Sequence, residues 1–380
     1  MSRQLRRTQR PSFIVCILGN LIAAVTSAVI TLVDPNSPAD SSKSPVQTHW
    51  GYTDSANHTA DLLPETWAKA YPGCDGRRQS PIPINTRLAV RDPALEPVAF
   101  VRYGTPSRND SWTAVNLGHV AQFTGHYATA PEIRGGSLGD DYVFLQFHFH
   151  WGSVNTRGSE HVIDGQRYPL ELHIVHRKSI FYDNEAPGDS TGFAALAIMF
   201  ELADSPVDEN DPRFVRISTL FTALLELTHP GQAKDVTLKD FRLQDFIPTS
   251  PVYYRYLGSL TTPPCAEAVM WTVFKEPLKV TQDQLNMFRT LKKHPHGDAA
   301  NNVLVDNFRP VQQSHGREVK IYPGQIVTTT TQATPASPRW LLPNPCLSLK
   351  RVARRHKRQP NWAWTRPQDC LNSEEDDDRR

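Results

Sequence analysis

Residues 141–151 predict one long β-strand, in which polar and apolar side chains alternate from Leu145 onward. Side chains of a strand point to opposite faces in turn, so positions two apart share a face. The face expected to pack in the core holds Val143, Leu145, Phe147, Phe149 and Trp151. The other face is expected to hold Tyr142, Phe144, Gln146, His148 and His150. The two histidines would lie about 7 Å apart at Cα, a spacing that suits two ligands of one ion.

A second alternating segment, residues 170–176, predicts a partner strand. One face carries the apolar Leu172 and Ile174, and the other carries Glu171, His173 and Val175. If the two strands are neighbours, three imidazoles meet on one face. Three neutral imidazoles with one open water position are typical of a catalytic zinc site rather than a structural one. The alternative is that these histidines are ordinary core or surface residues.

Short alternating segments continue between residues 98 and 200, and they predict a domain built mainly from strands. Residues 193–200 are apolar throughout, as expected for a strand that is buried on both faces. Helical signals are few. Thr281 and Gln284 have the spacing of a capping box. Asp211 and Pro212 are typical of a helix start, and apolar residues follow at helical spacing as Phe214, Ile217, Phe221 and Leu224.

Composition narrows the classes of function. The chain has 380 residues, 39% of them hydrophobic, which allows one large domain or two ordinary ones. Lys and Arg total 41 against 39 for Asp and Glu, so the net charge is only +2. Neither a basic excess nor an aromatic-basic motif indicates nucleic-acid binding. The 31 prolines are typical of long connections and of a tail outside the folded domain.

The first 33 residues are typical of a targeting segment. Four arginines between positions 3 and 10 precede an uncharged, largely apolar stretch from 13 to 33. We favour a cleaved signal peptide, with small residues at 26–28 before the cut, over an uncleaved type II membrane anchor. In both cases the domain is expected in the secretory lumen or outside the cell, because the basic leader stays cytosolic. Residues 34–48 are then a polar, proline-rich linker.

Residues 323–380 differ in kind from the rest of the chain and predict a disordered tail. A Thr/Pro-rich stretch at 328–338 is similar to an O-glycosylated stalk. A basic run follows at 350–358, where 355–358 also fit a furin-like protease, and an acidic run lies at 374–378. No apolar segment follows, so no lipid anchor is expected.

Four motifs occur in order along the chain: Gln-Phe-His-Phe-His-Trp-Gly at 146–152, Gly-Ser-Glu-His at 158–161, Glu-Leu-His-Ile-Val-His at 171–176 and Ser-Leu-Thr-Thr-Pro-Pro at 259–264. With these motifs, residues 49–322 closely resemble the α-class carbonic anhydrases of the secretory pathway. The resemblance implies a mainly β fold, a single large, twisted, mostly antiparallel sheet with a few short surface helices. It also implies an enzyme that reversibly hydrates CO₂ to bicarbonate and a proton through a zinc-bound hydroxide.

The resemblance also assigns a metal centre and the residues that orient it. His148, His150 and His173 would bind Zn²⁺. Gln146 would accept a hydrogen bond from the ring of His148, and Glu171 from that of His173, which fixes the tautomer of each ligand.

Substrate contacts follow from the same resemblance. Thr261 would accept from the zinc hydroxide and donate to Glu160, and Thr262 would help to seat bicarbonate. His119 would act as the proton shuttle, since imidazole titrates near physiological pH. The apolar pocket for CO₂ would comprise Val175, Ala195, Leu260 and Trp271.

Further marks of the secretory pathway come from cysteines and sequons. Cys74 and Cys265 match positions that are bonded in extracellular members of the family, so the resemblance predicts a disulfide between them. Asn57 and Asn109 begin the sequons Asn-His-Thr and Asn-Asp-Ser, which fit N-glycosylation.

The alternative from another class is an acatalytic relative that serves as an extracellular binding or matrix module. Such relatives typically lack one or more of the zinc histidines, and all three are present here. The basic and acidic blocks of the tail would suit an added contact with mineral or matrix. The expected partners are CO₂ and bicarbonate, with membrane contact only if the leader stays uncleaved. No oligomeric state is indicated.

Overall fold

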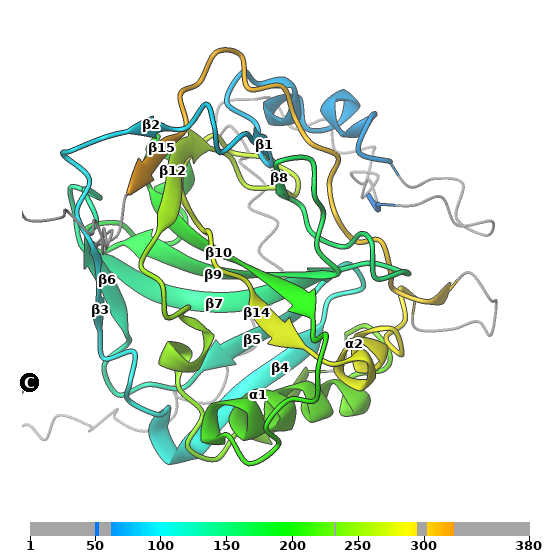
Figure 1. Ribbon diagram of the computed structural model, residues 1–380. Coiled ribbons are helices and arrows are strands. Elements are labelled where there is room, and N and C mark those ends of the chain that lie inside the picture. Colours follow the sequence, from blue (N-terminus) through cyan, green and yellow to red (C-terminus); the bar gives the residue numbers. More distant parts are fainter. Residues whose placement is uncertain (1–49, 53–61, 232, 295–301, 323–380) are drawn as a thin grey trace, which may run out of the picture. The chain divides into compact units, whose positions relative to one another are not determined.

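Residues 50–52, 62–231, 233–294 and 302–322 are described by the computed structural model (Figure 1). The predicted leader (1–33), the linker (34–48), the tail (323–380) and Asn57 lie outside these residues. Among the described helices, none has the length and apolar character needed to cross a membrane.

The strands are β1 (Pro83–Ile84), β2 (Val90–Arg91), β3 (Val98–Val101), β4 (Ser111–Asn116), β5 (Ala121–Gly125), β6 (Glu132–Gly135), β7 (Tyr142–Trp151), β8 (Val162–Ile163), β9 (Leu170–Lys178), β10 (Phe193–Leu202), β11 (Ala233–Thr237), β12 (Tyr253–Gly258), β13 (Val269–Phe274), β14 (Leu278–Val280) and β15 (Lys320–Tyr322). The α-helices are α1 (Pro212–Thr222) and α2 (Gln282–Phe288). Short 3-10 turns are η1 (Trp67–Lys69), η2 (Pro72–Asp75), η3 (Arg108–Asp110), η4 (Ala186–Gly188), η5 (Ala223–Glu226) and η6 (Leu243–Phe246).

Thirteen of the described strands form one large twisted sheet, in the order β11–β4–β5–β7–β9–β10–β13–β12–β15–β2 with β14, β3 and β6 beside this path. Most neighbours are antiparallel, but β10 runs parallel to β13 and β14, and β15 runs parallel to β2. Strands β1 and β8 form a separate parallel pair. The predicted fold class, a large and mostly antiparallel sheet with few helices, is confirmed.

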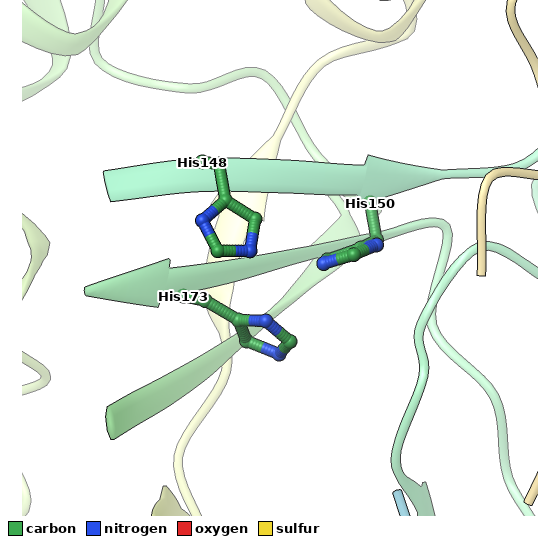
Figure 2. A group of neighbouring side chains, drawn as sticks. All are labelled: His148, His150 and His173. Carbon is green, nitrogen blue, oxygen red and sulfur yellow. The ribbon is translucent and has the colours of Figure 1, made fainter. Parts of the chain in front are cut away.

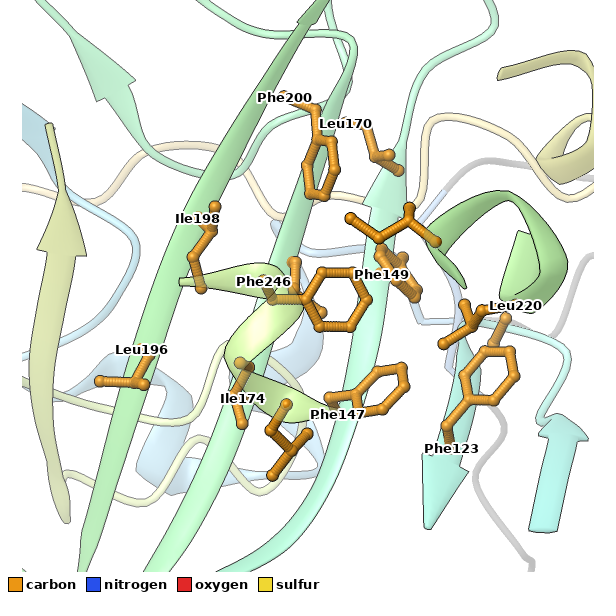
Figure 3. Close-up of a cluster of buried hydrophobic side chains, with 14 of the residues drawn as sticks. Phe123, Phe147, Phe149, Leu170, Ile174, Leu196, Ile198, Phe200, Leu220 and Phe246 are labelled. Carbon is orange, nitrogen blue, oxygen red and sulfur yellow. The ribbon is translucent and has the colours of Figure 1, made fainter. Parts of the chain in front are cut away.

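Two apolar clusters cover opposite faces of this sheet. The core cluster packs the sheet against α1, α2 and η6, and Figure 3 shows its centre, including Phe147, Phe149, Phe200, Leu220 and Phe246. The histidine-face cluster lies on the other side and includes Val175, Ala195, Tyr254, Tyr256 and Trp271. Strand β10 contributes to both clusters in alternation, and its residues from Phe193 to Phe200 are all buried. The prediction of a strand buried on both faces is therefore confirmed.

The alternation predicted for β7 is correct from Gln146 onward and wrong before it. Phe144 lies opposite His176 of β9, whereas Gln146 lies opposite Val175, so Leu145 is the extra residue of a β-bulge. Phe144 consequently belongs to the core cluster, and Leu145 packs against the histidine-face cluster. The bulge reverses the faces expected for Tyr142, Phe144 and Leu145.

Both predicted helix starts are confirmed. The Asp211 carboxylate accepts from the backbone N–H of Arg213 at 2.8 Å, and Pro212 is the first residue of α1. At α2, the Thr281 hydroxyl accepts from Gln284 N–H while the Gln284 side chain accepts from Thr281 N–H. Helix α1 ends at Thr222, and Leu224 is buried in the following 3-10 turn η5 rather than in the helix.

Candidate metal centre

Three histidines meet because β7 and β9 are antiparallel neighbours. His148 lies directly opposite His173, and His150 lies opposite Glu171. Figure 2 shows the three rings converging from the two strands. Their centroids are 5.1 Å apart for His148 and His150, 5.2 Å for His148 and His173, and 4.6 Å for His150 and His173. One potential ligand atom of each ring lies within 4.8 Å of the others.

Hydrogen bonds determine which nitrogen of each ring is left to face the centre. His148 Nδ1 donates to Gln146 Oε1 at 2.9 Å, and His173 Nε2 donates to Glu171 Oε1 at 2.7 Å. His150 Nδ1 donates to the Asn307 carbonyl at 2.7 Å. The remaining nitrogens are Nε2 of His148 and His150 and Nδ1 of His173. Each is left with a lone pair, as metal coordination requires.

Asn307 is a residue that sequence reasoning missed. Besides its carbonyl, its Oδ1 accepts from Trp151 N–H at 2.7 Å and its Nδ2 donates to the His119 carbonyl at 2.9 Å. It therefore ties the end of β7 to the turn that carries His119. No local pattern marks it, because its 157-residue separation from His150 is bridged only by the folded chain.

The Glu171 carboxylate is the centre of a fully buried network. Its Oε2 accepts from the backbone N–H groups of Glu160 and His161, each at 2.8 Å. Its Oε1 accepts from His161 Nδ1 at 2.6 Å as well as from His173. The other ring nitrogen of His161 bonds to the Tyr256 hydroxyl at 2.7 Å. His161 and Tyr256 were also missed, although His161 stands inside a recognised motif.

Glu160 is buried and points one oxygen at two of the three imidazoles. Its Oε1 accepts from Arg309 N–H at 2.8 Å. Its Oε2 lies 3.5 Å from His150 Nε2 and 3.9 Å from His173 Nδ1. Within the described part of the chain, neither Glu160 Oε2 nor His150 Nε2 has a hydrogen-bond partner. The hydrogen bond expected from Thr261 to Glu160 stays a prediction.

Burial favours the neutral form of His148 and His150, and neighbouring histidines favour the ionised form of Glu171. Burial lowers the pKa of His148 well below its ordinary value, and His150 and His173 lower it further. Burial likewise lowers the pKa of His150, against the opposing effect of Glu160. Burial raises the pKa of Glu171, but His161 and His173 outweigh it and hold that pKa well below its usual range. Metal ligands must be deprotonated, so this state is ready to bind a cation.

The loop after β12 carries Thr261 and Thr262 and is anchored on both sides. The Trp271 indole N–H donates to the Ser259 carbonyl at 3.1 Å, and Leu260 N–H donates to the Ala266 carbonyl at 3.0 Å. Thr261 is buried and Thr262 is half-buried. Cys265 at the end of this loop forms the predicted disulfide with Cys74, across a separation of 191 residues.

Apolar residues line the same face of the sheet as the histidines. Val175, Ala195 and Trp271 are buried in the histidine-face cluster, and Leu260 packs against it half-buried. The Trp271 ring lies 4.7 Å from the His173 ring between centroids. Val175, Ala195 and Trp271 are neighbours across β9, β10 and β13, and the CO₂ pocket itself stays a prediction.

His119 and Asn109 lie outside this cluster. The His119 ring is half-buried, and its centroid lies 4.5 Å from that of Trp50. It is close enough to the centre to contribute to the lowered pKa of His148. Asn109 is exposed in the turn before β4, as a glycosylated asparagine must be.

The donor set fits zinc. Three imidazole nitrogens with an acceptor behind each ring, and one buried carboxylate oxygen without a partner, leave room for a fourth, exchangeable ligand. A mainly β domain with three converging histidines of this kind could hold a metal ion.

Comparison with known proteins identifies the family. Residues 62–323 match the family described as eukaryotic-type carbonic anhydrase. The chain is 34% identical over 279 residues to Carbonic anhydrase 15 of Mus musculus, and this alignment covers 72% of the chain and 83% of the mouse protein. The chain therefore belongs to the eukaryotic-type carbonic anhydrases, and the resemblance drawn from its motifs is confirmed.

Proposed function

We propose that this carbonic anhydrase hydrates CO₂ reversibly to bicarbonate and a proton at a Zn²⁺ held by His148, His150 and His173. The observation that carries the proposal is the orientation of the three rings. Each ring donates one N–H to an oxygen acceptor, so the opposite nitrogens converge with their lone pairs free. Zinc bound there would supply Lewis-acid activation of water at neutral pH.

Gln146, Glu171 and Asn307 keep the imidazoles in the tautomers that zinc requires. Glu171 contributes most, because its carboxylate also holds the backbone of Glu160 and His161. Glu160 adds a buried negative charge beside the centre, which compensates part of the charge of a dication. We assign Thr261 to orienting the reacting oxygen and Thr262 to bicarbonate, on the family motif and on the anchoring of their loop.

The apolar face suits a small neutral substrate. Val175, Ala195, Leu260 and Trp271 offer no hydrogen-bonding competitor to CO₂ apart from the indole N–H, which is already bonded to Ser259. His119 is assigned as the proton shuttle. It is half-buried at the edge of the site and so has access both to the centre and to solvent.

We further propose that the domain spans residues 49–322 and works in the secretory pathway or outside the cell. The buried Cys74–Cys265 disulfide supports an oxidising compartment. Secretion after cleavage of the leader is favoured over anchoring, and residues 323–380 form an appended tail.

The test is zinc content together with CO₂ hydration, measured on the full chain secreted from a eukaryotic host. One zinc per chain and catalysis are expected. His148→Ala should lose both after dialysis, whereas the control His126→Ala should keep both, since His126 is a half-buried histidine that bonds to Thr113 outside the centre. A folded, disulfide-bonded chain that binds zinc without catalysis, or binds no zinc, would favour the acatalytic binding module instead.

A further inference from the structure

A buried arginine lies on the face of the sheet opposite the histidines. Arg255 is the third residue of β12, between Tyr254 and Tyr256, which belong to the histidine-face cluster. Tyr253, two positions before it, belongs to the core cluster. Because side chains of a strand alternate, the Arg255 side chain shares the core face with Tyr253. Only 5% of Arg255 is exposed.

No hydrogen bond satisfies this guanidinium within the described residues. Its Nε, Nη1 and Nη2 atoms are all buried without a partner. Arginine has five N–H donors and stays protonated inside proteins, so it cannot escape the cost of burial by losing its charge. A buried charge is normally paired or hydrogen-bonded. Among the described residues, the buried guanidinium therefore lacks an anionic partner that would neutralise its charge.

Lys320 of β15 lies opposite Arg255 in the ladder, and it is already paired with Asp92 at 2.7 Å. The guanidinium carbon of Arg255 lies 5.2 Å from the centroid of the Tyr253 ring, which stabilises one face of the cation. Tyr253 and Tyr142 are the groups that act on its charge, and no carboxylate is among them. Thr272 of β13 lies directly opposite Arg255 in the ladder, and its hydroxyl is also buried without a partner among the described residues.

We propose that Arg255 and Thr272 bind a small monovalent anion, of the chloride or bicarbonate type, on the core face of the sheet. The guanidinium supplies charge and a fork of donors, and the threonine hydroxyl supplies a further donor from the neighbouring strand. Directly opposed residues of an antiparallel pair have Cβ atoms about 5 Å apart, so one small ion can contact both side chains. A single negative charge matches the single buried positive charge.

The guanidinium lies close beneath a surface turn. Gly136 lies in the turn after β6, buried between the exposed Gly135 and Ser137. A Cβ built on Gly136 would lie 3.4 Å from Arg255 Nη2 and 2.8 Å from Val98 Cγ2. Glycine at this point, with φ +55°, thus brings the surface turn into contact with the arginine.

This site is independent of the proposed catalysis, since it lies across the sheet from the three histidines. The experiment uses the full secreted chain. Crystals grown with bromide in place of chloride should show an anomalous peak within hydrogen-bonding distance of the Arg255 guanidinium. The melting temperature should rise by about 2–3 °C for each tenfold increase of free anion above its Kd. Separate titrations with chloride and with bicarbonate decide which of the two is bound more tightly.

Two variants separate this effect from anions that bind elsewhere. Arg255→Met removes the charge at similar length and should abolish the anion-dependent rise in melting temperature. Arg91→Met removes an exposed arginine from β2 of the same sheet and should keep the full rise. If Arg255→Met does not fold, Arg255→Lys keeps the charge without the fork and should raise the Kd at least tenfold. The proposal is overturned by the lack of a bromide peak at Arg255, or by an equal anion response in the wild type and the Arg255 variant.

Discussion

His148 lies directly opposite His173 in the β7–β9 ladder, with 5.2 Å between their ring centroids. This pairing depends on the bulge at Leu145. Before the bulge Phe144 pairs with His176, and an uninterrupted ladder would continue from there to place His148 opposite Leu172. The extra residue shifts the register by one, so that two histidines of the centre face one another.

We expect the bulge to respond differently to deletion and to insertion. Deleting Leu145 restores a regular ladder with every observed pair kept, so zinc should stay bound while stability falls by about 1–3 kcal/mol for the lost apolar side chain. Inserting an alanine after Gln146 turns the histidines to the core face and should abolish zinc binding. Zinc analysis and urea unfolding of both variants check this. If the variant that lacks Leu145 lost zinc, the assigned role of the bulge would be contradicted.

Glu171→Gln should weaken zinc binding about 10–100-fold. The carboxylate accepts four hydrogen bonds, two from imidazoles and two from backbone N–H groups. The NH₂ group of an amide cannot accept a hydrogen bond, so it must face either the two backbone N–H donors or the two imidazole donors. The loss of either pair weakens the support of the His173 ring. Competition with a chelator measures the affinity. Glu65→Gln, at an exposed position, is the matched control and should bind zinc as the wild type does; an equal effect in both variants would argue against the network.

His119→Ala should slow turnover by roughly 10²-fold in dilute buffer and leave zinc content unchanged. Small imidazole buffers should restore the rate, because they carry the proton that the side chain no longer moves. His315→Asn is the control, since His315 is exposed and asparagine tolerates its φ of +49°. A rate for His119→Ala that matches the wild type at low buffer would remove His119 from the mechanism.

His176 should make the fold sensitive to acid. Its Nδ1 donates to the Ala194 carbonyl, so its Nε2 accepts from the Tyr103 hydroxyl. Burial lowers the pKa of His176 to about 3. The unfolded chain takes up a proton near pH 6.5, and the folded chain does so only near pH 3. Stability is therefore lost as pH falls from about 6.5 toward 3, by roughly 2 kcal/mol at pH 5.

His176→Gln keeps an acceptor for Tyr103 and removes this titration. Urea unfolding at pH 7 and pH 5 should show a smaller loss of stability for the variant, by the same roughly 2 kcal/mol. Comparing the change between the two pH values, rather than absolute stability, cancels the cost of the substitution itself. An identical loss in the wild type and the variant would mean that other groups govern the acid response.

The sequence by itself determined the local structure of this protein and the identity of its candidate ligands. The period-two pattern of β9, the apolar run of β10, the caps at Asp211 and Thr281, and the paired histidines of β7 all follow from local sequence over a few residues. The family motifs added the disulfide and the sheet architecture, because Cys74 and Cys265 are 191 residues apart and no local pattern joins them.

Only the tertiary structure decided how distant segments complete the site. Asn307 behind His150, Tyr256 behind His161 and the direction of Glu160 depend on chain segments that meet after folding. The bulge at Leu145 also depends on tertiary packing. Burial of Tyr142 and Phe144 in the core cluster is more favourable than a regular alternation along β7. The unpaired Arg255 is invisible in the sequence for the same reason. Periodicity is a property of one strand, whereas the partners available to a buried charge depend on which strands are neighbours in the folded sheet.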